Sequence, residues 1–222
     1  MTILSVQHVS KTYGKKHTFQ ALKDINFDIQ KGEFVAIMGP SGSGKTTLLN
    51  VLSSIDQISS GSVIANGQEL NKLNQKALAK FRKESLGFIF QDYSILPTLT
   101  VKENIMLPLS VQKMSKATME ENYKAITTAL GIYDLGNKYT SELSGGQQQR
   151  TAAARAFVHK PQIIFADEPT GALDSKSAND LLQRLEEMNK SFDTTIVMVT
   201  HDDEIIERYP SRRSEEHTSE LQ

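Results

Sequence analysis

The opening stretch of the chain alternates between apolar and polar residues, as strands do when they bury one face. Apolar side chains recur with a period close to two over residues 3–9 and again over residues 22–29, which predicts two half-buried strands. A turn at residues 31–33 leads into residues 34–38, a continuous apolar run that predicts a fully buried strand. Up to this point the pattern indicates mostly antiparallel β structure.

From Phe34 onward, apolar runs alternate with segments whose apolar residues recur at helical spacing. The runs predict strands at residues 62–65, 86–90, 163–166 and 195–199, and the helical spacing predicts helices at residues 46–52, 75–83 and 177–190. Alternating strands and helices are typical of a parallel sheet with crossover helices. We therefore expect an α/β fold with a parallel sheet and an N-terminal antiparallel β subdomain.

Residues 92–158 break this alternation. Prolines occur at positions 97 and 108, and Met119, Tyr123, Ile126 and Leu130 recur at helical spacing. We interpret this segment as a helical subdomain inserted into the α/β core.

The composition excludes several classes of function. The chain has 222 residues, of which 38% are hydrophobic and 23% charged, which is ordinary for one large globular domain. A formal net charge of −1 gives no overall field toward nucleic acid, so we expect no nucleic-acid partner. There is no Cys, which excludes disulfides and thiolate metal sites. No apolar run approaches the roughly 18 residues of a membrane span, so any membrane role must come through a partner.

A phosphate-binding loop follows the strand predicted at residues 34–38. The pattern G-x-x-x-x-G-K-[ST] is complete, and the loop and the next residue read Gly39, Pro40, Ser41, Gly42, Ser43, Gly44, Lys45, Thr46 and Thr47. Strand, glycine-rich loop and helix form the context that this motif requires. We expect the loop's N–H groups and the helix dipole to hold a nucleoside triphosphate. Lys45 would reach its terminal phosphates, and Thr46 would join a Mg²⁺ shell.

Two acidic residues end the strand predicted at residues 163–166. Ligands of α/β sheets lie beyond the carboxyl ends of the strands, so we expect Asp167 to hold Mg²⁺ directly or through water. Glu168 would polarise the attacking water as a general base. The alternative is a surface carboxylate pair that caps a turn before Pro169, and position alone leaves that alternative open for Glu168.

A second glycine-containing segment precedes the helix predicted at residues 148–157. Ser144 fits a helix N-cap, and Gly145 and Gly146, before Gln147, expose backbone N–H groups. The segment predicts a second anion site at a helix start, although spacing alone favours an ordinary cap. One triphosphate needs only one loop, so we infer that this second cradle closes over the nucleotide of another subunit.

Three further side chains are candidates by their place in the pattern. Gln91 and His201 each follow a predicted strand, where the first could reach a metal-bound water and the second the γ-phosphate or the attacking water. Tyr13 could stack on a purine. Taken alone, each is more often a surface or packing residue.

Taken together, these residues resemble the ATPase subunit of ABC transporters, over residues 3–209. In that family's terms, the Walker A motif is residues 39–46, the Walker B motif is residues 163–167, and the signature is residues 143–147. The glutamine loop is Gln91, and the D-loop is residues 171–174, ending at Asp174. The catalytic carboxylate is Glu168, and the switch histidine is His201. The resemblance implies ATP and Mg²⁺ as cofactors, with Thr46, Gln91 and Asp167 around the metal. It also implies a homodimer with two ATP held head to tail, each between one Walker A motif and the partner's Ser144–Gln147 segment.

Longer stretches at residues 38–56, 87–104 and 163–177 resemble one group within that family. The group holds lipoprotein-release, macrolide-export and bacitracin-type peptide-resistance ATPases, of which the last is most similar. It implies a peripheral subunit on the cytoplasmic face of the membrane, docked on an integral membrane permease through the groove near residues 91–104. A soluble relative that acts on nucleic acid or ribosomes is the alternative, but the tandem copies or long insertion of such relatives are absent. A sensing module without catalysis is disfavoured by the intact Lys45, Asp167, Glu168 and His201.

The resemblance fades near Tyr209. Family members continue with a helix and further strands after the switch histidine, so we expect the C-terminal strands of the core to be missing. Residues 210–222 have the composition of a disordered tail, and residues 213–222 resemble the in-frame translation of a common sequencing adapter. We interpret this tail as artefactual, the result of a truncated gene fused to adapter sequence.

Overall fold

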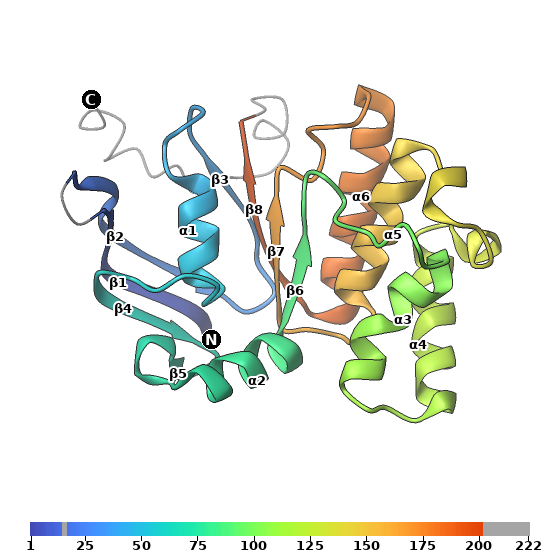
Figure 1. The fold of residues 1–222 in the computed structure, drawn as a ribbon, viewed down its shortest axis with the longest axis horizontal. Coiled ribbons are helices and arrows are strands. Elements are labelled where there is room, and N and C mark those ends of the chain that lie inside the picture. Colours follow the sequence, from blue (N-terminus) through green and yellow to red (C-terminus); the bar gives the residue numbers. More distant parts are fainter. Residues whose placement is uncertain (15–16, 202–222) are drawn as a thin grey trace.

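The computed structural model of the chain describes residues 1–14 and 17–201. The predictions for residues 202–222, including the adapter-like tail and the end of the core, lie outside the described residues. Within that part of the chain the strands form two four-stranded sheets. Figure 1 shows the antiparallel sheet on the left, the parallel sheet in the centre, and helices α3 to α6 on the right.

The N-terminal sheet is antiparallel, as the period-two pattern predicted. It is formed in the order β2-β1-β4-β5 by β1 (Thr2–Tyr13), β2 (Phe19–Gln30), β4 (Ser60–Ala65) and β5 (Gln68–Glu69). β1 continues to Tyr13, which pairs with Phe19. Backbone pairing with β2 extends the strand beyond the point where apolar alternation ends.

The second sheet is parallel and contains the strands that the apolar runs predicted at residues 34–38, 86–90, 163–166 and 195–199. The strand predicted at residues 62–65 does not join it, because β4 pairs with β1 in the antiparallel sheet. The parallel sheet is formed in the order β3-β8-β7-β6 by β3 (Phe34–Met38), β6 (Leu86–Ile89), β7 (Ile163–Asp167) and β8 (Thr195–Thr200). Because its strands are parallel, their carboxyl ends meet at one edge of the sheet. The phosphate loop and the residues that follow β6, β7 and β8 therefore lie along that edge.

The helices connect the strands or cover the sheet. They are α1 (Lys45–Leu52), α2 (Gln75–Ser85), α3 (Val101–Val111), α4 (Lys116–Ala129), α5 (Gly145–Phe157) and α6 (Ser175–Phe192), with short 3-10 segments at Leu70–Lys72, Tyr133–Leu135 and Thr140–Glu142. Helices α3, α4 and α5 lie within residues 92–158, the segment interpreted as a helical insertion.

Two hydrophobic cores lie on opposite faces of the parallel sheet. Along β7, Ile163 and Phe165 belong to the core that contains the apolar residues of α1 and the antiparallel sheet. Ile164 and Ala166 belong to the other core, together with the buried faces of α3 to α6. Successive side chains of a strand point to opposite faces, so α1 and α5 cover opposite faces of the same sheet.

Candidate functional site

The loop between β3 and α1 requires glycine at position 44 and is crowded at position 39. Gly44 has φ +86°, and a Cβ there would lie 2.5 Å from the carbonyl oxygen of Ala21. A Cβ on Gly39 would lie 2.4 Å from Ser43 Oγ. Gly44 also caps α1 without a side-chain hydrogen bond. The first N–H groups of a helix have no intrahelical acceptor, so those of α1 are available to an anion.

Lys45 is directed back over this loop. Its Nζ atom donates hydrogen bonds to the carbonyl oxygens of Gly39, at 2.7 Å, and Pro40, at 2.9 Å. The residue is only 8% exposed, which places a positive charge close to the loop's N–H groups. This combination of a fixed cation and helix N–H donors suits the terminal phosphates of a nucleotide.

Asp167, at the end of β7, lies beside the start of α1. Thr46 Oγ1 is 3.5 Å from Asp167 Oδ1. Burial raises the pKa of Asp167; the Thr46 hydrogen bond and the Lys45 charge oppose that shift, while the charge of Glu168 adds to it. A desolvated carboxylate beside a hydroxyl gives two hard oxygen ligands. They fit Mg²⁺, which proteins bind through one or two carboxylates together with phosphate oxygens.

In the part of the chain that the structure describes, no group of three or more His, Cys, Asp or Glu side chains could hold a metal ion.

Glu168 and His201 form a pair beside this edge. His201 Nδ1 is 3.0 Å from Glu168 Oε1. The backbone of Glu168 has φ +44°, a left-handed conformation that is uncommon for residues other than glycine. It is held there because its N–H donates to Val199 O and its carbonyl accepts from Gly171 N, each at 3.0 Å.

Gln91 follows β6 and lies against the backbone after β7. A Cβ on Gly171 would lie 2.9 Å from Gln91 Nε2. The small residue at position 171 therefore makes room for the Gln91 amide. The edge of the parallel sheet thus brings together the phosphate loop and the residues that end β6, β7 and β8.

The segment at residues 143–147 forms a helix cap. Ser144 Oγ accepts from Gln147 N at 3.3 Å, and Gln147 Oε1 accepts from Ser144 N at 3.0 Å. This reciprocal capping box confirms Ser144 as the N-cap of α5. Gly145 and Gly146 form the first turn of that helix, on the sheet face opposite to α1. The structure therefore does not bring this segment to the phosphate loop of the same chain.

Asp174 caps the neighbouring helix. Its Oδ1 accepts from Ser177 N at 3.0 Å, and its Oδ2 accepts from Ser177 Oγ at 2.7 Å. The hydrogen bond from the Ser177 N–H is the main reason why the pKa of Asp174 lies below its ordinary value. A Cβ on Gly146 would lie 3.4 Å from Ser177 Oγ. The signature segment and the D-loop are therefore adjacent at the starts of α5 and α6.

Tyr13 lies at the end of β1, and its hydroxyl interacts with the side chain of Thr47, the residue after the phosphate loop. The neighbouring strand β2 also contacts the loop. Leu22, which pairs with Lys11 of β1, and Ala21 are the residues that a Cβ on Gly44 would meet. The Tyr13 residue is 39% exposed.

One buried polar residue near the edge has no counterpart in the sequence-based predictions. Gln149, on α5, is 0% exposed, and its Nε2 donates to the carbonyl oxygens of Pro169 and Phe90. It thereby joins α5 to the segments that follow β6 and β7. The sequence signal for this contact was a polar residue on the face of a predicted helix that is otherwise buried.

Comparison with known proteins identifies the family. Residues 22–171 match the family model of the ABC transporter. The bacitracin export ATP-binding protein BceA of Halalkalibacterium halodurans is 59% identical over 203 residues, which cover 91% of this chain and 80% of that protein. The macrolide export ATP-binding/permease protein MacB of Marinobacter nauticus is 40% identical over 204 residues, which cover 91% of this chain and 32% of that protein.

A solved structure supports the same assignment. It is the dimeric structure of a post-hydrolysis state of the ATP-binding cassette MJ0796 bound to ADP and Pi. The two chains superpose with a TM-score of 0.82 at 39% identity, covering 91% of this chain and 89% of that one. Across residues 1–14 and 17–201, no helix has both the length and the apolar character that a bilayer crossing requires. The resemblance inferred from the motifs is confirmed: the chain belongs to the ABC transporter family, as an ATP-binding and ATP-hydrolysing subunit.

Proposed function

We propose that this chain powers the export of antimicrobial peptides of the bacitracin class, or resistance to them. The observation that carries this proposal is the 59% identity to the bacitracin export ATP-binding protein over 91% of the chain. The subunit would act at the cytoplasmic face of the membrane, docked on an integral membrane permease that selects the cargo. A lipoprotein-release or macrolide-export role is the second candidate, favoured by the similarity to MacB.

The nucleotide would bind along the edge of the parallel sheet. The phosphates would lie on residues 39–47, within reach of Lys45. Thr46 and Asp167 would hold Mg²⁺, with Gln91 reaching the ion or its bound water. The ion would neutralise the charge on the β- and γ-phosphate oxygens, and the base would stack on Tyr13.

Glu168 would serve as the general base for hydrolysis. Its side chain is 21% exposed and its Oε1 lies 3.0 Å from His201 Nδ1, an arrangement that can orient both groups toward one water molecule. The carboxylate would accept a proton from the attacking water, and His201 would orient that water or hold the γ-phosphate.

The second cradle would act across a dimer. Ser144, Gly145, Gly146 and Gln147 begin α5, which belongs to one hydrophobic core, while α1 belongs to the other. Because the two helices cover opposite faces of the sheet, one chain cannot use both cradles on one nucleotide. A homodimer joined head to tail would place each Ser144–Gln147 segment over the partner's nucleotide.

Mixing two inactive variants tests the shared site. Lys45→Ala removes the phosphate-loop cation and Ser144→Arg blocks the second cradle, so each homodimer lacks any complete site. A mixed dimer retains one complete site, and we expect ATP hydrolysis to return on mixing. Absence of recovery, with mixed dimers demonstrated by differential tags and ATP still bound by the Ser144→Arg variant, would contradict the proposal.

Drug sensitivity tests the cargo. Deleting the gene and re-expressing either the parent chain or a Glu168→Gln variant separates the effect of hydrolysis from that of the protein's presence. We expect the deletion to sensitise cells to bacitracin, and the parent chain alone to restore growth. Sensitisation to a macrolide instead would favour the second candidate.

A further inference from the structure

Asp56 connects two residues of β1 that lie more than forty positions away in the sequence. Its Oδ2 accepts a hydrogen bond from Tyr13 Oη at 2.7 Å, and its Oδ1 accepts one from Lys11 Nζ at 2.8 Å. Lys11 Nζ also donates to Gln57 O at 2.6 Å. These bonds outweigh the effect of burial, so the pKa of Asp56 lies below its ordinary value. Asp56 therefore holds the Tyr13 ring by its hydroxyl end.

The backbone of Asp56 is attached to the phosphate-loop helix. The backbone N–H groups of Ile55 and Asp56 both donate to Asn50 O, at 2.9 and 3.1 Å, and Asn50 lies within α1. The N-terminus of α1 is the phosphate end of the candidate site. One helix thus carries the phosphate cradle at its first turn and the anchor of Tyr13 just beyond its last.

Lys11 covers one face of the Tyr13 ring. Its Nζ atom lies 4.6 Å from the ring centroid, and the Lys11 residue is 8% exposed, whereas Tyr13 is 39% exposed. A cation on one face of an aromatic ring is an attractive contact, and it leaves the opposite face as the place for a base. Lys11 therefore limits which face of the ring can stack.

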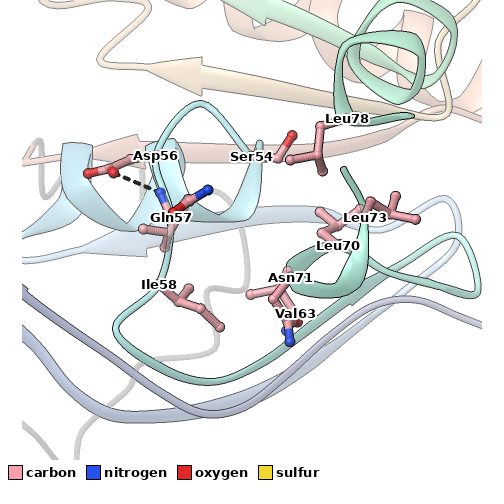
Figure 2. Close-up of a pocket in the computed structure, with 10 residues that line it drawn as sticks. Ser54, Asp56, Gln57, Ile58, Val63, Leu70, Asn71, Leu73 and Leu78 are labelled. Atoms are coloured by element: carbon pink, nitrogen blue, oxygen red, sulfur yellow. Dashed lines mark hydrogen bonds between the residues drawn. The ribbon is translucent and has the colours of Figure 1, made fainter. Parts of the chain in front are cut away.

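The segment that carries Asp56 is not tightly packed on its other side. Asp56 and Gln57 line an open pocket of about 150 Å³, together with Ser54, Ile58, Val63 and Leu78 (Figure 2). Beside this pocket, hydrogen bonds to Tyr13, Lys11 and Asn50 hold Asp56 in place. Loss of those bonds would let Tyr13 move.

We propose that Asp56 and Lys11 are positioning residues for nucleotide recognition, which fix the Tyr13 ring at a set distance from the phosphate loop with one face open to a purine base. This inference rests on the proposed stacking of the base on Tyr13. A purely structural role would brace the antiparallel sheet and would affect every ligand of the site equally. A positioning role affects only ligands that carry a base.

Two ligands separate these roles. We would measure the dissociation constants of an uncleaved ATP analogue and of inorganic tripolyphosphate, both with Mg²⁺, for the full chain and for the Asp56→Asn and Tyr13→Phe variants. Tyr13→Phe removes the hydroxyl that donates to Asp56, and Asp56→Asn leaves one acceptor oxygen where the parent offers one to Tyr13 and one to Lys11. We expect ATP-analogue affinity to fall about threefold to tenfold, a part of the loss expected on removing a stacked aromatic side chain, and tripolyphosphate affinity to stay unchanged.

A matched control removes a carboxylate that does not touch Tyr13. Glu69 pairs with Lys72 at 2.6 Å, with its side chain 28% exposed against 34% for Asp56. Glu69→Gln should leave both dissociation constants unchanged. If Asp56→Asn and Tyr13→Phe weaken both ligands equally, or neither, the positioning role is wrong.

Tyr13→Leu separates this inference from the function on which it rests. It removes the ring, so it should weaken the ATP analogue at least as much as the other variants. If Tyr13→Leu has no effect, base stacking itself is wrong. If Tyr13→Leu weakens binding of the ATP analogue but Tyr13→Phe and Asp56→Asn do not, base stacking is supported and the positioning role of Asp56 is wrong.

Discussion

The imidazole of His201 and the carboxylate of Glu168 face each other at the edge of the parallel sheet, with Nδ1 3.0 Å from Oε1. They follow the ends of adjacent strands, since Asp167 pairs with Val199. The Glu168 side chain is 21% exposed and that of His201 59% exposed, so the histidine lies nearer to solvent. The two groups are close enough to act on one water molecule.

Glu168→Gln tests the role of the carboxylate. The amide has the same shape but cannot accept a proton at neutral pH, so we expect the turnover rate to fall by about 100-fold or more, as when a general base is removed. ATP affinity should stay unchanged. Single-turnover release of phosphate and equilibrium binding measure the two quantities.

His201→Ala provides the comparison for that prediction. If both residues serve one step, the double variant should be no slower than Glu168→Gln alone, since residues that act as a unit are not additive. If the double variant loses turnover by the product of the two single-variant losses, the two residues do not serve one step.

Gly42 and Gly44 form a matched pair for testing the backbone of the phosphate loop. Both have positive φ, of +82° and +86°, but a Cβ on Gly42 meets nothing within 4 Å, whereas one on Gly44 lies 2.5 Å from Ala21 O. Gly42→Ala should lower the free energy of unfolding by about 1–2 kcal/mol, the cost of a left-handed conformation. Gly44→Ala should cost about 1–3 kcal/mol more, because the clash adds overpacking. Urea unfolding of the two variants measures the difference, and equal costs would contradict a close approach of Gly44 to Ala21.

Gly171→Ala tests whether the position of Gln91 matters. The added methyl group would lie 2.9 Å from Gln91 Nε2, and φ at Gly171 is not positive, so the flexible side chain rather than the backbone should move. We expect the unfolding midpoint to be maintained while ATP turnover falls about tenfold, as happens when reacting groups are misplaced. In a Gln91→Ala background, adding Gly171→Ala should cause no further change in ATP turnover. A drop in stability with normal turnover would show instead that residue 171 matters only for packing.

Asp167→Asn should change stability in a pH-dependent way. Burial raises the pKa of Asp167 in the folded chain, above the unfolded value of about 3.9. The ionised carboxylate therefore destabilises the native state at neutral pH, and this penalty fades as the pH falls through the folded pKa toward the unfolded one. Without nucleotide, the variant should unfold at a higher temperature than the parent at neutral pH, and the difference should shrink on acidification.

Magnesium and ATP should reverse that order. The parent gains from a bound ion that neutralises Asp167, whereas the asparagine variant loses a charged ligand. Thermal unfolding with and without Mg²⁺ and an uncleaved ATP analogue measures both effects. A variant stabilised by the complex as strongly as the parent would argue against Asp167 as a metal ligand.

Much of the fold was predictable from local patterns. Apolar runs located β7 and β8 because these strands are buried on both faces, and they located β3 although Phe34, Ile37 and Met38 are only half-buried. Glycine spacing located the phosphate loop because Gly44 has a backbone that requires glycine. The length of β1 was not predictable, since its last residues are polar and only pairing with Phe19 keeps Tyr13 in the strand.

Contacts between distant segments were also beyond the sequence pattern. Asp56 follows α1 in what looks like an ordinary polar turn, and only the fold brings it to Lys11 and Tyr13. Gln149 likewise looks like any polar helix residue until α5 packs against the ends of β6 and β7. Local spacing carries no information about such pairs.

The central strand β7 shows what keeps the site in register. Each of its residues from Ile163 to Ala166 is apolar and buried, so a slip by one position would expose nothing to water, unlike a slip in a strand with one polar face. Sliding is opposed by side-chain size, because Phe165 fills one core while Ala166 leaves space for the other. A slip in one direction would also carry the Asp167 carboxylate into the buried part of the strand. The position of the acidic pair after this strand is thus set by the sizes of side chains that never meet a ligand.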